Sequence, residues 1–151
     1  MKKPIKKKAL PRSGIKLTPR AMGESRLRAA NIQMADAVNK IAETVHMLND
    51  QWWKNPKNGR RIKRNKAEMI ALMHSELSEA LEAVRKDAKD GHLPQWRGEE
   101  IEMADAVIRI FDYCAGHGLN IGEAIMAKLF YNLQRADHKP ENRLKRNGKK
   151  F

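Results

Sequence analysis

The sequence predicts an all-α fold, on the strength of three observations. Hydrophobic residues make up 41% of the 151-residue chain, yet aromatic residues make up only 5%. The apolar content is therefore mostly Ala, Leu, Ile, Val and Met, which favours helix over sheet. Apolar residues recur at spacings of three and four positions, and the sustained alternation typical of strands is absent. A chain of this length suits one domain with one hydrophobic core.

The first two expected helices occupy the N-terminal half of the chain. Apolar residues with helical spacing predict a first helix that begins between Gly23 and Asn31 and ends near Asp50. A capping-box pattern that opens at Asn65 predicts the start of the second helix, which ends near Lys89. The expected core face of the second helix is one apolar stripe, made of Ile70, Met73, Leu77, Leu81 and Val84.

Two further helices are expected in the C-terminal half. The third begins near Gly98 and is stopped by the glycines at 116 and 118. It is apolar almost all the way round, apart from a narrow polar stripe, so it should be buried on most sides. The fourth opens at Asn120, which with Glu123 forms a second capping-box pattern.

Four carboxylates in two matched pairs lie on the second and third expected helices. Glu76 and Glu79 are three residues apart, as are Glu102 and Asp105, so each pair shares a helix face. Two antiparallel helices would bring all four together, where two carboxylates 4 Å apart repel by ~4 kcal/mol at an effective dielectric of 20. A proton, an Arg or Lys, or a hard cation would relieve this repulsion. Oxygen-only ligands suit Mg²⁺ or Mn²⁺ and not zinc; otherwise, the acids are ordinary solvated faces of amphipathic helices.

The context of these acids resembles the MazG-like all-α nucleoside triphosphate pyrophosphohydrolases. The residues that carry the resemblance are His74–Glu82 (HSELSEALE) and Glu100–Arg109 (EIEMADAVIR). The stretch Ile121–Lys128, followed by Asn132 and Arg135, is similar to the last core helix of that family. The similarity covers roughly residues 32 to 137. It implies a four-helix MazG-like bundle that oligomerises through its helices, as a dimer or tetramer.

The resemblance also implies an activity and a cofactor. The expected reaction is the Mg²⁺-dependent hydrolysis of a nucleoside triphosphate to the monophosphate and pyrophosphate, with Mn²⁺ as a possible substitute metal. Such an enzyme would serve nucleotide housecleaning or removal of a signalling nucleotide. The expected metal ligands are Glu76, Glu79, Glu102 and Asp105. One carboxylate would act as general base, and Glu79 is the candidate, although the sequence does not settle which acid does so.

Four further residues are expected to bind the substrate. Lys128 and Asn132 share a face of the fourth helix and would contact the phosphates, or that face is simply solvated. Arg109 either binds the phosphate chain or neutralises Asp105, one turn before it. Trp53, next to Trp52 at the end of the first helix, either covers the core or stacks on the base.

The net charge of +13 is concentrated in three segments: residues 1–28, 54–66 and 138–151. Together they hold 23 basic and two acidic residues, so the rest of the chain must carry a charge of −8. We therefore expect a basic flexible tail (1–28), an all-α catalytic domain (29–137) and a basic C-terminal tail (138–151). The basic segments favour anionic partners. A helical nucleic-acid-binding module without catalysis is the alternative function, and a relative that binds nucleotide without turnover is a third.

The sequence predicts a cytoplasmic protein without membrane association. No apolar run approaches the roughly 20 residues that span a bilayer, and Ala9–Pro11 is too short to serve as a signal-peptide core. The single Cys114 cannot form an internal disulfide and fits a reducing compartment.

Overall fold

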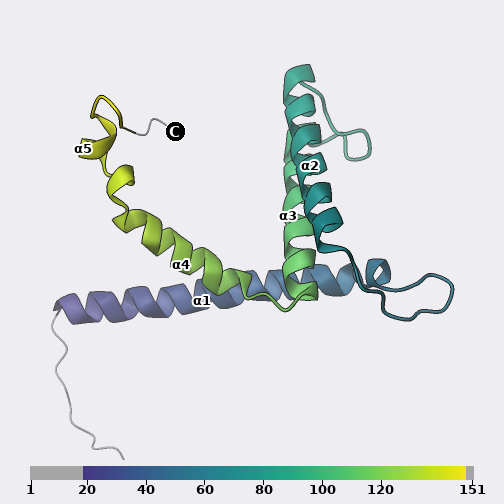
Figure 1. Cartoon of the computed structure of the whole chain (residues 1–151), viewed down its shortest axis with the longest axis horizontal. Coiled ribbons are helices and arrows are strands. Elements are labelled where there is room, and N and C mark those ends of the chain that lie inside the picture. The colour runs from purple at the N-terminus through teal and green to yellow at the C-terminus, as the bar shows by residue number, and fades with distance from the viewer. Residues whose placement is uncertain (1–18, 149–151) are drawn as a thin grey trace, which may run out of the picture.

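A long N-terminal helix forms the base on which the other helices are arranged (Figure 1). The computed structural model describes the backbone of residues 19–148 and the side chains of residues 28–148. Helix α1 (Pro19–Leu48) begins earlier than expected and includes residues 19–28 of the predicted tail. Proline is favoured at the first helical position, and the Arg, Ala and Met that follow are compatible with helix. The remainder of the predicted tails, residues 1–18 and 149–151, lies outside the described residues.

Helices α2 (Lys66–Lys86) and α3 (Gly98–Gly116) form an antiparallel hairpin that stands on α1 (Figure 1). They pack against each other along their length, and α3 also packs on α1. This hairpin is the arrangement that the paired acids required, because it places the carboxylates of α2 opposite those of α3.

Local capping signals set the helix boundaries. Asn65 and Asn120 were both predicted as N-caps, and each side-chain oxygen accepts a hydrogen bond from the backbone of the first turn. Helix α3 begins at Gly98 as predicted. Helix α2 ends before the expected Lys89, because Asp87 takes a left-handed conformation (φ 47°) that releases the chain from the helix.

Helix α4 (Ile121–Gln134) packs on α1 and diverges from the hairpin (Figure 1). Its contact with α1 requires a glycine, since a Cβ at Gly122 would lie 2.1 Å from the carbonyl oxygen of Ala35. The Gly122 N–H donates to Asn39 Oδ1 (2.8 Å), and Asn39 Nδ2 donates to Asn120 Oδ1 (2.8 Å). The first turn of α4 is therefore fixed on α1 by close approach and by two hydrogen bonds.

Three short helices complete the described chain. They are η1 (Asp50–Trp53), η2 (Ala136–His138) and α5 (Pro140–Arg143). The last two differ from the expectation of irregular structure after residue 137. Pro140 stands at the start of α5, where its missing N–H is harmless, and Asn142 Nδ2 donates to the Ala136 carbonyl oxygen (2.7 Å). Within residues 19–148 there is no β-strand, so the all-α prediction is confirmed.

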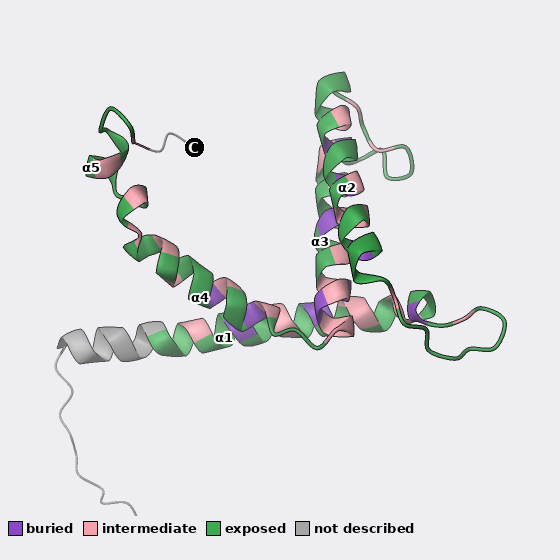
Figure 2. Ribbon diagram, viewed as in Figure 1, coloured by how far each residue is buried: buried purple, intermediate pink, exposed green. Residues whose placement is uncertain are grey.

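Much of the apolar surface of the helices is uncovered (Figure 2). The buried core is built mainly from small side chains, among them Ala35, Ala42 and Ala106. The predicted core stripe of α2 is not buried within a single chain; Leu81, for example, is 62% exposed. The buried face of α2 is a different one, which faces α3 and contains Glu76. Helix α3 likewise exposes Met103 and Val107, against the expectation of burial on most sides.

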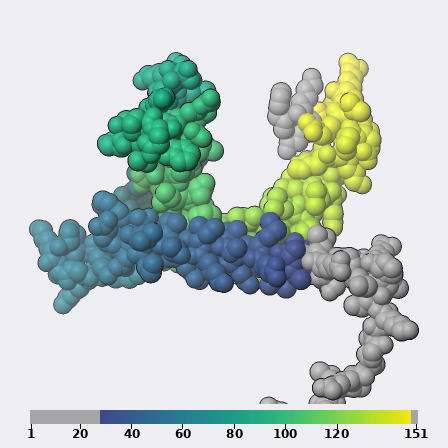
Figure 3. Space-filling view, turned by 180° about the vertical axis from the view of Figure 1, so that it is seen from behind, coloured from purple at the N-terminus to yellow at the C-terminus, as the bar shows by residue number. Residues whose placement is uncertain are grey.

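The space-filling view shows a wide hollow above α1, between the hairpin on one side and α4 on the other (Figure 3). One copy of the chain therefore has an open arrangement of helices. None of the described helices combines the length and the apolar character needed to cross a membrane.

Candidate metal and nucleotide site

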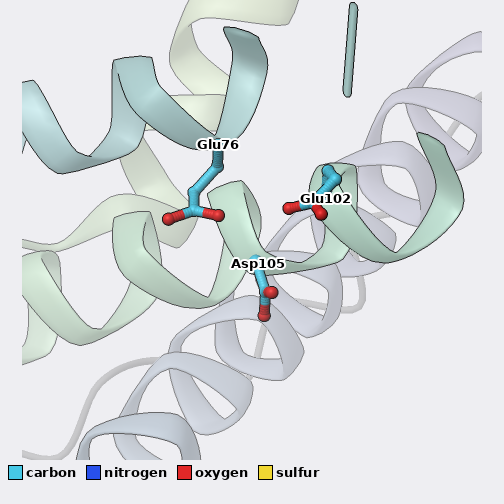
Figure 4. Close-up of side chains that lie close together, drawn as sticks. All are labelled: Glu76, Glu102 and Asp105. Atoms are coloured by element: carbon cyan, nitrogen blue, oxygen red, sulfur yellow. The ribbon is translucent and has the colours of Figure 1, made fainter. Parts of the chain in front are cut away.

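Three of the four predicted acids converge between α2 and α3. Glu76 extends from α2 toward α3, where Glu102 and Asp105 lie one turn apart (Figure 4). One carboxylate oxygen from each of the three lies within 4.8 Å of the other two. Glu76 is only 5% exposed, because it projects from the α2 face that packs on α3. We call these three residues the acidic cluster.

Glu79 is the fourth predicted acid and is not part of this convergence. It is exposed on α2, one turn beyond Glu76. Its charge is nonetheless close enough to Glu102 to raise the pKa of that carboxyl group. The structure thus places Glu79 at the rim of the acidic cluster, within the electrostatic reach of Glu102.

Two members of the acidic cluster have raised pKa values. Burial is the largest cause of the raised pKa of Asp105, and the charge of Glu76 adds to it, while Arg109 opposes it. Burial also raises the pKa of Glu102, and the charges of Glu79, Glu76 and Asp105 raise it further. Both carboxyl groups are therefore harder to ionise than isolated ones, which is the expected electrostatic state of acids gathered without a cation.

Arg109 forms an ion pair across the hairpin. Its Nε donates to Glu76 Oε1 at 2.6 Å, which joins α3 to α2. The sequence left open whether Arg109 binds phosphate or neutralises Asp105. The structure shows a direct bond to Glu76, and only a charge interaction with Asp105.

The donor set fits a hard divalent cation. All three converging side chains are carboxylates, and no histidine or cysteine belongs to the acidic cluster. Oxygen donors of this kind are preferred by Mg²⁺ and Mn²⁺, which keep several waters and use few protein ligands. Arg109 is bonded to Glu76, but Glu102 and Asp105 are still repelled by neighbouring carboxylates, and a divalent cation would relieve that repulsion.

A pocket of about 520 Å³ opens beside the acidic cluster. Asp105 of the acidic cluster lines it together with Arg109, Trp52 and Arg64. Its remaining lining combines an amide, an acid and apolar side chains: Asn49, Asp112, Met69, Leu72 and Ile108. The pocket therefore offers an aromatic face, two guanidinium groups and an amide within one cavity next to the acids.

Of the two roles left open for Trp53, covering the core or stacking on a base, the structure shows the first, because Trp53 is buried. It is 3% exposed, and its indole Nε1–H donates to both carboxylate oxygens of Asp112 (2.9 and 3.0 Å). His46 Nδ1 bonds to the same carboxylate at 2.7 Å, and a Cβ at Gly116 would fall 2.3 Å from the indole. Its neighbour Trp52 is 63% exposed and lines the pocket instead.

The sequence did not predict that Asp112 bonds to Trp53 and His46, nor that Trp52, Asn49 and Arg64 line the pocket. Asp112 belongs to the polar stripe of α3. A polar residue on an otherwise apolar helix was the only sign in the sequence of a buried Asp112 with hydrogen-bond partners, here Trp53 and His46. Nothing in the sequence distinguished Trp52 from Trp53, which are adjacent at a helix end. Arg64 was marked only as part of the basic segment 54–66, which favours anionic partners, and Asn49 carried no signal, since its position depends on how the chain turns after α1.

The basic loop between η1 and α2 folds back toward the pocket. Arg64 Nη1 donates to the Trp52 carbonyl oxygen (3.0 Å), which fixes its guanidinium at the pocket. The Arg61 guanidinium lies 5.3 Å from the Trp53 ring centroid and 3.1 Å from His46 Nε2. Two of the loop's cations are thus held near the candidate site by specific contacts.

Lys128 and Asn132 lie on α4, away from the acidic cluster of their own chain. Lys128 Nζ stands 4.9 Å from the ring centroid of Tyr131. Asn132 lines a separate apolar pocket beside η2, and its buried Oδ1 has no hydrogen-bond partner among the described residues. No residue of α4 lines the pocket that adjoins the acids. Within one chain, the fold does not bring the two predicted phosphate ligands to the site.

Comparison with protein-family models, with curated proteins and with solved structures finds no match to this chain. The family resemblance therefore rests on the motif residues themselves.

Replacing Glu102 with Gln is expected to raise the melting temperature of the metal-free protein at pH 7 by about 1–4 °C. The change removes repulsion worth about 1 kcal/mol from the acidic cluster. A raised pKa means that the folded state binds protons more readily than the unfolded chain, so the repulsion destabilises the fold above the ordinary pKa of a carboxyl group. The difference between the two proteins should shrink as the pH is lowered from 7 toward 4. Thermal melts across this range, with EDTA present, measure it.

Proposed function

We propose that the protein is a Mg²⁺-dependent nucleoside triphosphate pyrophosphohydrolase. The observation that carries the proposal is that Asp105 of the acidic cluster also lines a pocket that presents an exposed indole and two arginines. A triphosphate needs a divalent cation and positive charge for its phosphates, and its base needs an aromatic or apolar surface. The chemistry of this pocket meets each of these requirements.

Glu76, Glu102 and Asp105 would hold the cation, with Glu79 at the rim as a fourth ligand or as the general base. When bound, Mg²⁺ supplies charge neutralisation of the phosphates and a more acidic water. The exposed carboxylate of Glu79 would accept the proton of the attacking water, and Arg64, which lines the pocket, would bind phosphate oxygens. Attack at the α-phosphorus breaks the bond to the β-phosphate, so the products are the monophosphate and pyrophosphate.

Trp52 is the residue we assign to base stacking. Replacing it with Ala should weaken nucleotide binding about tenfold, since stacking on an aromatic ring contributes about 1–3 kcal/mol per base. The affinity for inorganic tripolyphosphate, which has no base, should stay unchanged. Calorimetric titration of both ligands measures the contrast. Equal losses for the two ligands would instead point to a general disturbance of the pocket.

The active unit proposed here is an oligomer of at least two copies, in which helices of different chains complete a four-helix bundle. A compact body of this mass would expose about 7,800 Å², whereas the whole chain, terminal segments included, exposes 13374 Å². The excess is larger than the total area that obligate dimers commonly bury, about 2,000–5,000 Å². The hollow between the hairpin and α4 is the surface that a second copy would fill (Figure 3).

The same oligomer would account for Lys128 and Asn132. Their helix diverges from the acidic cluster of its own chain, yet it projects away from the body, where it can reach a neighbour (Figure 1). A second copy seated in the hollow would bring its α4 toward the first copy's acids, and the arrangement would be reciprocal about a two-fold axis. Each site would then combine acids from one chain with phosphate ligands from the other.

A screen of ribo-, deoxyribo- and modified nucleoside triphosphates with Mg²⁺, with pyrophosphate as the measured product, tests the proposed activity. Release of pyrophosphate that stops when EDTA is added is the expected result. Absence of pyrophosphate from every triphosphate at micromolar protein would reject the enzyme. Salt-sensitive binding to nucleic acid that is indifferent to substitution of the acids would favour the nucleic-acid-binding alternative.

A further inference from the structure

Arg109 contacts two parts of the candidate site at once. Its Nε donates to Oε1 of Glu76, one of the three acids of the acidic cluster, and Arg109 also lines the adjoining pocket. The Arg109 side chain is 42% exposed, while Glu76 is almost fully buried. The arginine can therefore leave Glu76 by rotating into the pocket, whereas Glu76 has no comparable freedom to follow it.

In the structure, Arg109 provides the positive charge that a divalent cation would otherwise provide. It is the basic group directly bonded to the acidic cluster among the described residues, and its charge also favours ionisation of Asp105. A divalent cation at Glu76 would compete for the same carboxylate and would repel the guanidinium. We therefore expect cation binding at Glu76 to break the ion pair between Arg109 and Glu76.

We propose that Arg109 is a substrate-binding residue that couples divalent-cation binding to triphosphate binding. This inference rests on the proposed function. In the metal-free protein Arg109 is held by Glu76; when the cation takes Glu76, the guanidinium turns into the pocket and binds the phosphate chain there. Breaking the pair opposes binding of the cation alone, and the phosphates then supply a new partner for the freed arginine. The cation and the triphosphate therefore strengthen each other's binding, a coupling that is reciprocal by necessity.

The test compares Arg109→Gln with the unaltered protein in three titrations that need no turnover. With Mn²⁺ alone, the variant should bind about tenfold more tightly, because no ion pair has to be broken. With inorganic tripolyphosphate in EDTA, the two proteins should agree within about twofold, because Arg109 is still held by Glu76. With the preformed Mn²⁺–tripolyphosphate complex, the variant should bind about tenfold more weakly. Arg109→Lys, which keeps the charge, should recover part of the last affinity.

The matched control is Arg85→Gln, which removes a guanidinium from the same hairpin. Arg85 is exposed and pairs with Glu82, away from the acidic cluster, so its loss should change none of the three affinities. Weaker binding of tripolyphosphate in EDTA by Arg109→Gln would mean a fixed phosphate contact and would overturn the coupling. Unchanged Mn²⁺ affinity would overturn it as well.

The outcomes separate this inference from the proposed function. If the unaltered protein releases pyrophosphate but the three titrations do not show the expected pattern, only the coupling fails. If the titrations show the pattern but no triphosphate yields pyrophosphate, the coupling stands and the proposed catalysis fails.

Discussion

Pyrophosphate release is expected to fall at least about a thousandfold when Asp105 is replaced with Asn. The substitution keeps the size of the side chain but removes the negative charge that a divalent cation requires. Loss of electrostatic stabilisation worth about 4 kcal/mol corresponds to this factor. Asp105 is the most informative acid to change, because it belongs both to the acidic cluster and to the lining of the pocket. Steady-state release of pyrophosphate at saturating Mg²⁺ provides the measurement.

Asp36→Asn serves as the matched control for this substitution. Asp36 is exposed on α1, so the same change of charge and shape should leave the rate within about twofold. The helical content of Asp105→Asn should also match that of the unaltered protein, and its melting temperature without metal should be no lower. A variant that folds and still releases pyrophosphate at a normal rate would show that the acidic cluster is not the catalytic site.

The second large effect is expected when two inactive variants are combined. Asp105→Asn lacks a cation ligand, and a double variant with Lys128→Ala and Asn132→Ala lacks the phosphate ligands of α4. Each should be at least about a hundredfold less active alone, given roughly 1.5–3 kcal/mol for each hydrogen bond to a charged group. Co-expression should restore about a quarter of the normal activity, since a quarter of the shared sites would then receive both intact halves.

Light scattering accompanies the mixing experiment, because the recovery depends on exchange between chains. A monomer at micromolar concentration, or mixed oligomers without recovered activity, would contradict a site shared between copies. In the second case the acidic cluster could still act alone, with Arg64 and Arg109 as its phosphate ligands. The control pairs Asp105→Asn with Glu102→Gln: both chains lack an acid of the acidic cluster, so no shared site would be complete and activity should not recover.

Local signals in the sequence predicted the helices well, because each depends on only a few neighbouring residues. Asn65 and Asn120 cap helices where their spacing to the following turn indicated. The convergence of Glu76 with Glu102 and Asp105 was also predictable, because a helical hairpin needs only the spacing within each pair. The end of α2 was not, because Asp87 adopts a left-handed conformation that its residue type permits but does not require.

The features that were missed depend on how separate elements are placed against one another. Leu77 and Leu81 looked like a core stripe, but periodicity identifies an apolar face without saying what covers it. Trp53 was chosen over Trp52 although only the packing of Asp112 and His46 decides which indole is enclosed. The distance between α4 and the acids likewise follows from the contact of Gly122 with α1, which no spacing in the sequence expresses.

The contact of Gly122 with α1 sets the direction in which α4 extends. The helix is fixed on α1 at its first turn, and its 14 residues extend about 21 Å from there. A change of about 10° in its tilt would swing the far end by about 3–4 Å, which exceeds the length of a hydrogen bond. Any side chain larger than hydrogen at Gly122 would meet the Ala35 carbonyl and force such a tilt. The positions of Lys128 and Asn132 therefore depend on Gly122, a residue that has no side chain.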